Sequence, residues 1–175
     1  MVTRLSSATT EAVYSAMQAC NKHCVFRCSN AWFSVPAISV RQLVVAPELV
    51  RVPRCHPALV GIGRLRGEFL PVVSLQNLLE TQTPSELSAN DCLMVLDGGC
   101  TWSLLISESV ALSPLEIIVS QESLVENANN IVIGTAMFRD RIVRALNPNG
   151  LLVAAQSALE RYWDSSERQF AVSTN

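Results

Sequence analysis

Cysteine and histidine are the residues of this chain that are best suited to chemistry. Cys20, Cys24 and Cys28 recur at every fourth position with His23 among them, a set that could hold a metal ion or form disulfides. Zinc modules, however, use two close pairs separated by a loop, and the other three cysteines provide no second close pair. In a cytosolic protein, cysteine is more often a small buried hydrophobe. We therefore expect structural thiols and no metal site.

The Cys55-His56 pair could form a thiol and imidazole dyad. Adjacent residues of an extended chain point to opposite sides, so a hydrogen-bonded dyad is sterically awkward here. The surrounding sequence, PRCHP, favours a loop histidine between prolines. A thiol-dependent enzyme or redox sensor that uses Cys55 remains the alternative hypothesis.

Other catalytic signatures are missing from the sequence. It contains no G-x-S-x-G elbow, phosphate loop or H-E-x-x-H motif, and Gly61 and Gly63 form only a G-x-G inside a β-type pattern. The carboxylates are scattered over turns and polar ends. We expect no enzymatic activity and no cofactor, because a chain without a recognisable active site usually works by binding.

Composition narrows the possible partners. A formal charge of -2 gives no basic stripe for nucleic acid or an acidic membrane surface. No apolar run reaches the ~18 to 20 residues of a spanning helix, and the first residues lack the apolar block of a signal peptide. We therefore expect a cytoplasmic protein. With 49% hydrophobic residues, the chain can build a substantial core.

The elements expected to position any site are mainly strands, because apolar residues alternate with period two. An extension of residues 1–21 is expected to hold a short helix after Thr9 or Thr10, and residues 81–90 form a polar link. The predicted strands are 24–28 and 31–38 around a Ser29-Asn30 turn, 39–46, 61–65, 68–73, 93–96, 101–106, 110–112, 131–138 and 142–146. Helices are expected at 75–80 and 151–163, residues 113–130 form a long connection, and residues 165–175 form a tail.

The two halves of the chain repeat each other. Residues 66–79 align without a gap on residues 139–152, from an arginine through a turn and an apolar strand to a Leu-Leu pair. The hairpin that starts at His23 matches the hairpin that starts at Asp91. Because each unit is too small to be stable alone, the two should share a core. We expect an all-β fold of two small barrels side by side.

The stretch from Val52 to Leu75 resembles the signature of CheW-like domains, the coupling proteins of bacterial chemotaxis arrays. The resemblance extends over about residues 22–153. The positions that carry it are Val52, Pro53, Gly61, Leu65, Arg66, Gly67, Pro71 and Leu75.

The resemblance implies two SH3-like five-stranded β-barrels around a shared hydrophobic core. It predicts a single CheW-like domain at 22–164, with one subdomain at about 22–80 and another at about 91–153. It also implies a non-catalytic, cytoplasmic adaptor. The implied partners are the regulatory domain of a CheA-type histidine kinase, itself CheW-like, and the cytoplasmic hairpin tip of a chemoreceptor.

Five residues are implied to form the partner-binding surface. Arg66 matches the arginine of the family's N-L-R-G motif, and Gln42 matches its usual acidic residue in V-x-E. These two are expected to pair near the receptor-binding surface, although a neutral Gln42 can accept only one hydrogen bond from the guanidinium. Val40, Leu65 and Gly67 are candidates for the same patch. Each has a core role as the alternative, which is favoured for Leu65, and the alternative for Arg66 is a structural turn arginine.

Several polar positions depart from the family pattern. Arg64 replaces an asparagine, His56 a proline and Ser74 an aspartate, while the apolar frame is kept. These changes indicate a divergent member, which could serve a chemotaxis system, a non-motility pathway such as one controlling pili, or a system whose receptor partner is altered or absent.

Overall fold

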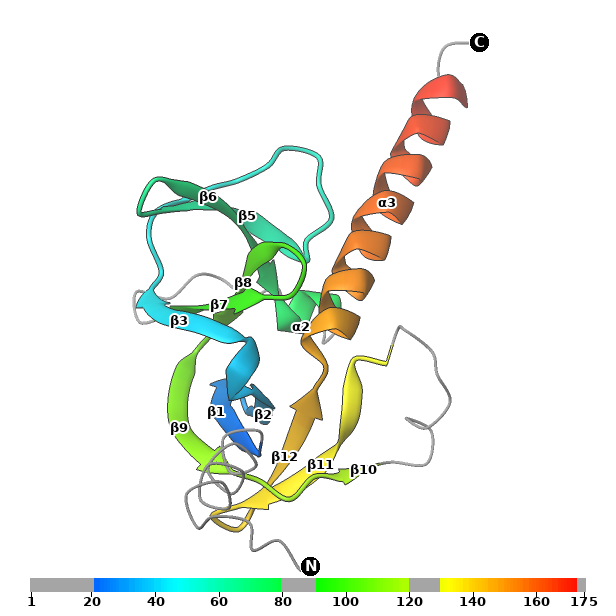
Figure 1. Cartoon of the computed structure of the whole chain (residues 1–175). Coiled ribbons are helices and arrows are strands. Elements are labelled where there is room, and N and C mark those ends of the chain that lie inside the picture. Colours follow the sequence, from blue (N-terminus) through cyan, green and yellow to red (C-terminus); the bar gives the residue numbers. More distant parts are fainter. Residues whose placement is uncertain (1–20, 80–90, 120–129, 173–175) are drawn as a thin grey trace, which may run out of the picture.

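The protein is an all-β structure of two six-stranded sheets with few helices, as expected (Figure 1). The computed structural model describes residues 21–79, 91–119 and 130–172, with side chains up to residue 165. The predicted amino-terminal helix and the 81–90 link lie outside these residues. Each sheet has one two-residue strand, β4 or β10, beyond the five strands expected for each barrel.

The first sheet has the order β10-β11-β12-β2-β1-β9 and the second has the order β3-β7-β8-β6-β5-β4. The elements are β1 (Lys22–Cys28), β2 (Ala31–Pro36), η1 (Ala37–Ser39), β3 (Val40–Val45), β4 (Leu49–Val50), β5 (Leu59–Leu65), β6 (Glu68–Ser74), α2 (Leu75–Leu78), β7 (Cys92–Asp97), β8 (Thr101–Ile106), β9 (Glu108–Pro114), β10 (Ile118–Val119), β11 (Val132–Phe138), β12 (Arg141–Leu146) and α3 (Pro148–Val172).

The sheets do not coincide with the two halves of the sequence. The β1–β2 hairpin joins strands β9 to β12 of the second half, and the β7–β8 hairpin joins strands β3 to β6 of the first half. We call this arrangement the hairpin exchange. A subdomain at about 22–80 and another at about 91–153 therefore correspond to neither sheet, because each half completes its sheet with a hairpin from the other half.

The sequence repeat appears as an internal two-fold symmetry. Replacing β1–β6 by β7–β12, and the reverse, converts the strand order of one sheet into that of the other. The joining contacts also correspond, since β2 pairs in parallel with β12 as β8 does with β6. Serine occupies the same place in both contacts, and in the second sheet the Ser103 hydroxyl donates to the Pro71 carbonyl oxygen at 3.2 Å. The predicted correspondence of 66–79 with 139–152 is therefore seen in space.

The hydrophobic core spans both sheets. Its largest cluster, which we call the shared core, combines residues of β1 and β2 with residues of β6, β7 and β8 and of helix α3. Phe26, Met94, Leu96, Trp102 and Leu104 are fully buried in it. Two smaller clusters lie inside the individual sheets, one around Val143 and one around Val72. The two units are thus joined by common packing, as expected.

Helix α3 is longer than the sequence predicted. It runs from Pro148 to Val172, so residues up to 172 of the expected tail are helical. The helix begins with a proline, which suits the first helical position, and the Asn147 side chain accepts a hydrogen bond from the Asn149 backbone N–H at 3.1 Å. No glycine or proline follows Gly150 to end it. None of the described helices is long and apolar enough to span a bilayer.

Gly61 and Gly134 occupy equivalent positions in β5 and β11. The pairing register shifts beside each of them, and each strand passes close to a two-residue edge strand there. A Cβ atom at Gly61 would lie 2.7 Å from the Val50 carbonyl oxygen, and one at Gly134 would meet the Ile118 carbonyl oxygen. Glycine is required at both positions because the backbone of the neighbouring strand occupies the space of a side chain.

We expect Gly61→Ala to lower the free energy of unfolding by about 2 kcal/mol, because the methyl group forces β4 away from β5. Urea unfolding followed by circular dichroism measures the change. Gly99→Asn is the matched control, since Gly99 has a φ of 86° and open space at its Cβ position. Asparagine carries a smaller penalty at positive φ than other side chains, so the control should lose about 1 kcal/mol or less and clearly less than Gly61→Ala. If Gly61→Ala is as stable as the wild type, β4 does not lie as close to Gly61 of β5 as described.

Candidate partner-binding surfaces

Three of the five predicted site residues lie at the tip of the β5–β6 hairpin. Leu65 pairs with Glu68, so Arg66 and Gly67 are the two central residues of the turn. Both have positive φ, 49° for Arg66 and 90° for Gly67, as a tight two-residue hairpin turn requires. Leu65 is half-buried, whereas the Arg66 side chain is exposed. The turn therefore presents the guanidinium of Arg66 to solvent.

The other two predicted residues, Val40 and Gln42, lie on β3, and an ion pair joins this strand to the hairpin tip. Nη1 of Arg41 lies 3.2 Å from Oε2 of Glu68. The two strands stand three places apart in the sheet order, which in a flat sheet means about 14 Å. The pair therefore requires the sheet to curl until β3 meets the β5–β6 hairpin, as in a small barrel.

Arg41 reaches the hairpin because of an irregularity in β3. The register with β7 shifts between Val40 and Gln42, so Arg41 is the extra residue of a bulge, and bulges re-aim side chains. The two charged side chains are 45% and 55% exposed, so their pairing contributes no more than about 1 kcal/mol. The pair therefore shows that the tip adjoins β3 but contributes little to holding it there.

The expected hydrogen bond between Gln42 and Arg66 is absent. Among the described residues, neither side chain forms a hydrogen bond or an ion pair. The structure instead pairs Arg41 on the strand with Glu68 on the hairpin. This pair occupies neighbouring positions and not those of the expected Gln42–Arg66 pair. Arg66 thus keeps its positive charge available on the surface.

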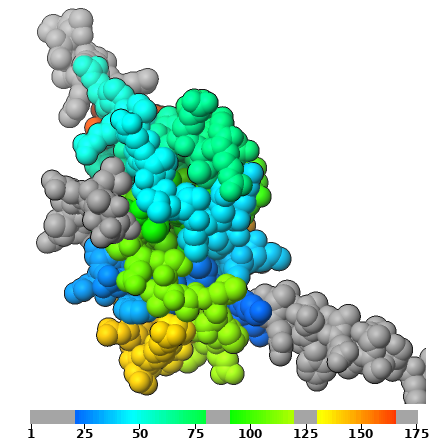
Figure 2. All heavy atoms as spheres, turned by 90° about the vertical axis from the view of Figure 1, so that its left-hand side faces the viewer, coloured from blue at the N-terminus to red at the C-terminus, as the bar shows by residue number. Residues whose placement is uncertain are grey.

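Val40 also lines a groove between the two sheets. The groove has a volume of about 360 Å³ and lies between β3 of one sheet and β9 of the other. Figure 2 views the face of the molecule where these two strands adjoin. We call it the inter-sheet groove; its lining includes Ala37, Val40, Leu43, Ser109, Val110 and Leu112. Most of these side chains are apolar, so the groove suits the apolar face of a helix.

The β9 side of the groove was not among the predicted site residues. Residues 110–112 were predicted only as a strand, although the stretch from Ser109 to Leu112 supplies half of the wall. Leu112 is 64% exposed on β9, a strand on which every other residue is half-buried or exposed. The sequence signal was an apolar pair, Val110 and Leu112, but nothing in the sequence indicates that β9 lies opposite β3.

Exposed apolar side chains also gather on the outer faces of the two equivalent hairpins. On β4, β5 and β6 they form the first hairpin patch, with Phe69 72% exposed and Val50 70% exposed beside Ile62. Val50 pairs with Ile62, which pairs with Pro71, so these residues form one row across the strands. The second hairpin patch contains Ile118, Met137 and Ile142. The internal symmetry therefore gives the molecule two apolar end surfaces.

The cysteines and histidines take mainly structural positions. Cys24 and Cys28 are buried in the shared core, as expected, whereas Cys100 is exposed. Cys20 lies outside the described residues, and within them no three His, Cys, Asp or Glu side chains are arranged to hold a metal ion. His23 is also buried, and this burial lowers its pKa.

Cys55 and His56 do not form an activated pair. Nδ1 of His56 accepts a hydrogen bond from the Ala58 backbone N–H at 3.1 Å, and its ring packs edge-on against Tyr162 of α3 at 5.9 Å between centroids. The imidazole therefore joins this loop to the helix. Burial raises the pKa of the Cys55 thiol, which opposes formation of a nucleophilic thiolate.

Comparison with known proteins identifies a family and similar solved structures. Residues 22–156 match the family described as the CheW-like domain. The chain is also similar to the scaffolding protein TtCheW from Thermoanaerobacter tengcongensis, with a TM-score of 0.63 and 18% sequence identity over 75% of this chain and 91% of that one. At this identity the similarity shows a common fold. A comparison with curated proteins gives no match.

We expect Cys55 to react with iodoacetamide at pH 7 no faster than free cysteine, because burial raises its pKa and His56 is engaged elsewhere. Peptide mass spectrometry after timed labelling measures the rate at each thiol. Exposed Cys100 serves as the internal control for access of the reagent. Faster labelling of Cys55 than of free cysteine would support the thiol-enzyme hypothesis instead.

Proposed function

Because the chain belongs to the CheW-like domain family, a family of non-catalytic scaffolds, we propose that it is an adaptor that couples a chemoreceptor to a CheA-type histidine kinase. The proposal includes a cytoplasmic location and the absence of catalysis. It applies equally to a chemotaxis system and to a non-motility pathway, since both would use the same surfaces. It also takes residues 22–164 as one CheW-like domain.

The observation that carries the proposal is the inter-sheet groove, which lies on the same strand, β3, that the positively charged hairpin tip adjoins. The groove is apolar and bounded by Val40 and Leu112, and the Arg41–Glu68 pair links the tip to β3. A receptor tip is a helical hairpin, whose apolar stripe would lie in the groove. Arg66 would then meet acidic side chains on the receptor helix. Val40, Gln42, Leu65, Arg66 and Gly67 are proposed as its partner-binding residues.

The hairpin patches are the proposed contact with the kinase. The regulatory domain of a CheA-type kinase is itself CheW-like, so two such modules could join through equivalent hairpin faces. Phe69 is the strongest candidate for an anchor, because exposed aromatic side chains carry much of the energy of protein interfaces. Two patches on one chain would allow two neighbours at once, as an adaptor in an array requires.

The thiol-dependent alternative is disfavoured by the geometry at Cys55. The neighbouring imidazole already accepts a backbone hydrogen bond. None of the contacts among the described residues places a base where it could deprotonate the Cys55 thiol. The adaptor is therefore the function that this surface supports best.

We expect Arg66→Glu and Leu112→Asp each to weaken binding of a receptor hairpin-tip fragment about tenfold, by charge repulsion at the tip and by a buried charge in the groove. Isothermal titration calorimetry at low salt measures the affinity. Arg161→Glu makes the same charge change on the exposed face of α3 and should leave the affinity unchanged.

Thermal unfolding of the same variants distinguishes binding from stability. Arg66 and Leu112 are exposed, so both variants should unfold within about 0.5 kcal/mol of the wild type. A large loss of stability for Arg66→Glu would indicate a structural turn residue. If both variants bind the receptor fragment as tightly as the wild type, the receptor does not bind in the inter-sheet groove.

We expect Phe69→Ser to weaken binding to a CheA-type regulatory domain by at least tenfold, because it removes the largest exposed apolar side chain of the first hairpin patch. Surface plasmon resonance against the isolated regulatory domain measures this. Val45→Ser is the matched control, since Val45 is 72% exposed on β3 but belongs to neither patch. If Ile142→Ser alone weakens the contact, the kinase binds the second patch and not the first.

A further inference from the structure

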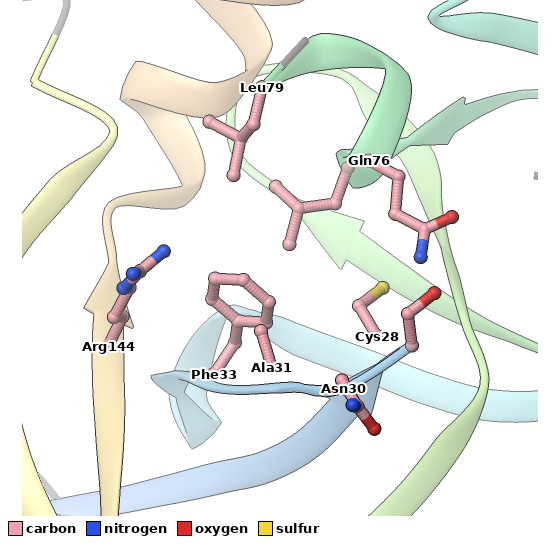
Figure 3. Close-up of a pocket in the computed structure, with 9 residues that line it drawn as sticks. Cys28, Asn30, Ala31, Phe33, Gln76, Leu79 and Arg144 are labelled. Atoms are coloured by element: carbon pink, nitrogen blue, oxygen red, sulfur yellow. The ribbon is translucent and has the colours of Figure 1, made fainter. Parts of the chain in front are cut away.

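A second cavity lies beside α2, away from both proposed partner surfaces. We call it the α2 pocket; it has a volume of about 320 Å³, within the range of small-ligand sites. Its apolar walls come from Phe33 and Ala31 of β2 and from Leu75 and Leu79 at the two ends of α2. Figure 3 shows Arg144 on one side of this space beside Phe33, and Gln76 on the opposite side.

The internal symmetry explains why the pocket is open. Phe33 corresponds to Trp102 in the other half, and α2 corresponds to the start of α3. There, Asn149 lies against Gly98, and Leu151 and Ala155 of α3 are buried with the larger Trp102 in the shared core. At the first site α2 ends after one turn and the smaller Phe33 fills less space. The α2 pocket is therefore the site in one half of the chain that corresponds, in the other half, to the space occupied by Trp102 and the start of α3.

The polar groups of the pocket favour an anion. Arg144 is exposed on β12 and, among the described residues, has neither an acidic partner nor a hydrogen bond through its side chain. Its guanidinium can bind a planar carboxylate through two parallel hydrogen bonds. A phosphate would be expected to recruit more than this single cation. Asn30, at the turn between β1 and β2, adds an amide to the rim.

Covalent chemistry in the pocket is disfavoured. Cys28 lines it, but its Sγ donates to the Leu105 carbonyl oxygen at 3.4 Å, and burial raises the pKa of this thiol to about 11. The thiol thus stays protonated at neutral pH and is a poor nucleophile. The pocket is suited to reversible binding.

We propose that the α2 pocket binds a small amphipathic carboxylate, an aromatic or short aliphatic carboxylic acid. Its apolar part lies on Phe33, Leu75 and Leu79, and its carboxylate pairs with Arg144. This inference goes beyond the adaptor role, since it adds a small-molecule site that uses neither the inter-sheet groove nor the hairpin patches.

The test uses octanoate and its uncharged counterpart octanol on the full chain labelled with ¹⁵N. Octanoate should shift the amide signals of Ala31, Gln76 and Leu79 saturably, with a dissociation constant of about 0.1 to 1 mM for a ligand of this size. Octanol, which lacks the charge, should bind at least fivefold more weakly. Arg144→Gln should weaken the binding of octanoate about five- to tenfold and leave the affinity for octanol unchanged.

Two further variants make the result decisive. Arg64→Gln removes an exposed arginine outside the pocket and should bind octanoate like the wild type. Ala31→Leu fills the pocket and should abolish binding of both octanoate and octanol. Unchanged amide signals from the rest of the protein confirm that this variant is folded. Equal affinity for octanoate and octanol, or an affinity unaffected by Arg144→Gln, overturns the proposal. It is also overturned if octanoate leaves the Ala31 and Leu79 signals unchanged, as it would if residues 80–90 of the chain filled the pocket.

Discussion

The parallel contacts of β6 with β8 and of β12 with β2 are the interactions on which the rest of the structure depends. Each contact is only two or three residue pairs long, yet it attaches a hairpin from one half of the chain to the strands of the other half. Parallel pairs need long connections and form slowly, so packing must stabilise them. That packing is the shared core, which holds Phe26 and Trp102 in one continuous cluster. Neither sheet can lose its hairpin without opening this core.

The proposed binding surfaces follow from the same arrangement. The β1–β2 hairpin brings β9 with it, because β1 pairs with both β2 and β9, and β9 thereby becomes the second wall of the groove beside β3. The bulge at Arg41 then joins β3 to the β5–β6 tip. This ion pair links the tip to β3, whereas the expected partners Gln42 and Arg66, both within the described part of the chain, do not interact.

Local features could be predicted from the sequence, and long-range pairing could not. The Ser29-Asn30, Arg66-Gly67 and Arg139-Asp140 turns follow from residue type and period-two patterning, and the resemblance identified the fold. The hairpin exchange was missed because an aligned repeat does not reveal which half supplies each partner strand. Leu112 was missed for the same reason, since its exposure depends on the strand opposite it. The end of α3 was placed too early because polar residues after Trp163 suggest a tail, although nothing in the sequence stops the helix there.

The hairpin exchange also suggests how such a chain could arise. Two copies of a half-length protein, each giving its hairpin to the other, would form a symmetric domain-swapped dimer with this strand order. Duplication and fusion of the gene would join the copies, and a link such as residues 81–90 would make the exchange intramolecular, with a high effective concentration. Once fused, the copies no longer need to be identical. One half could then keep a long helix over its core while the other shortened its helix to one turn, leaving the cavity beside α2 as a trace of that divergence.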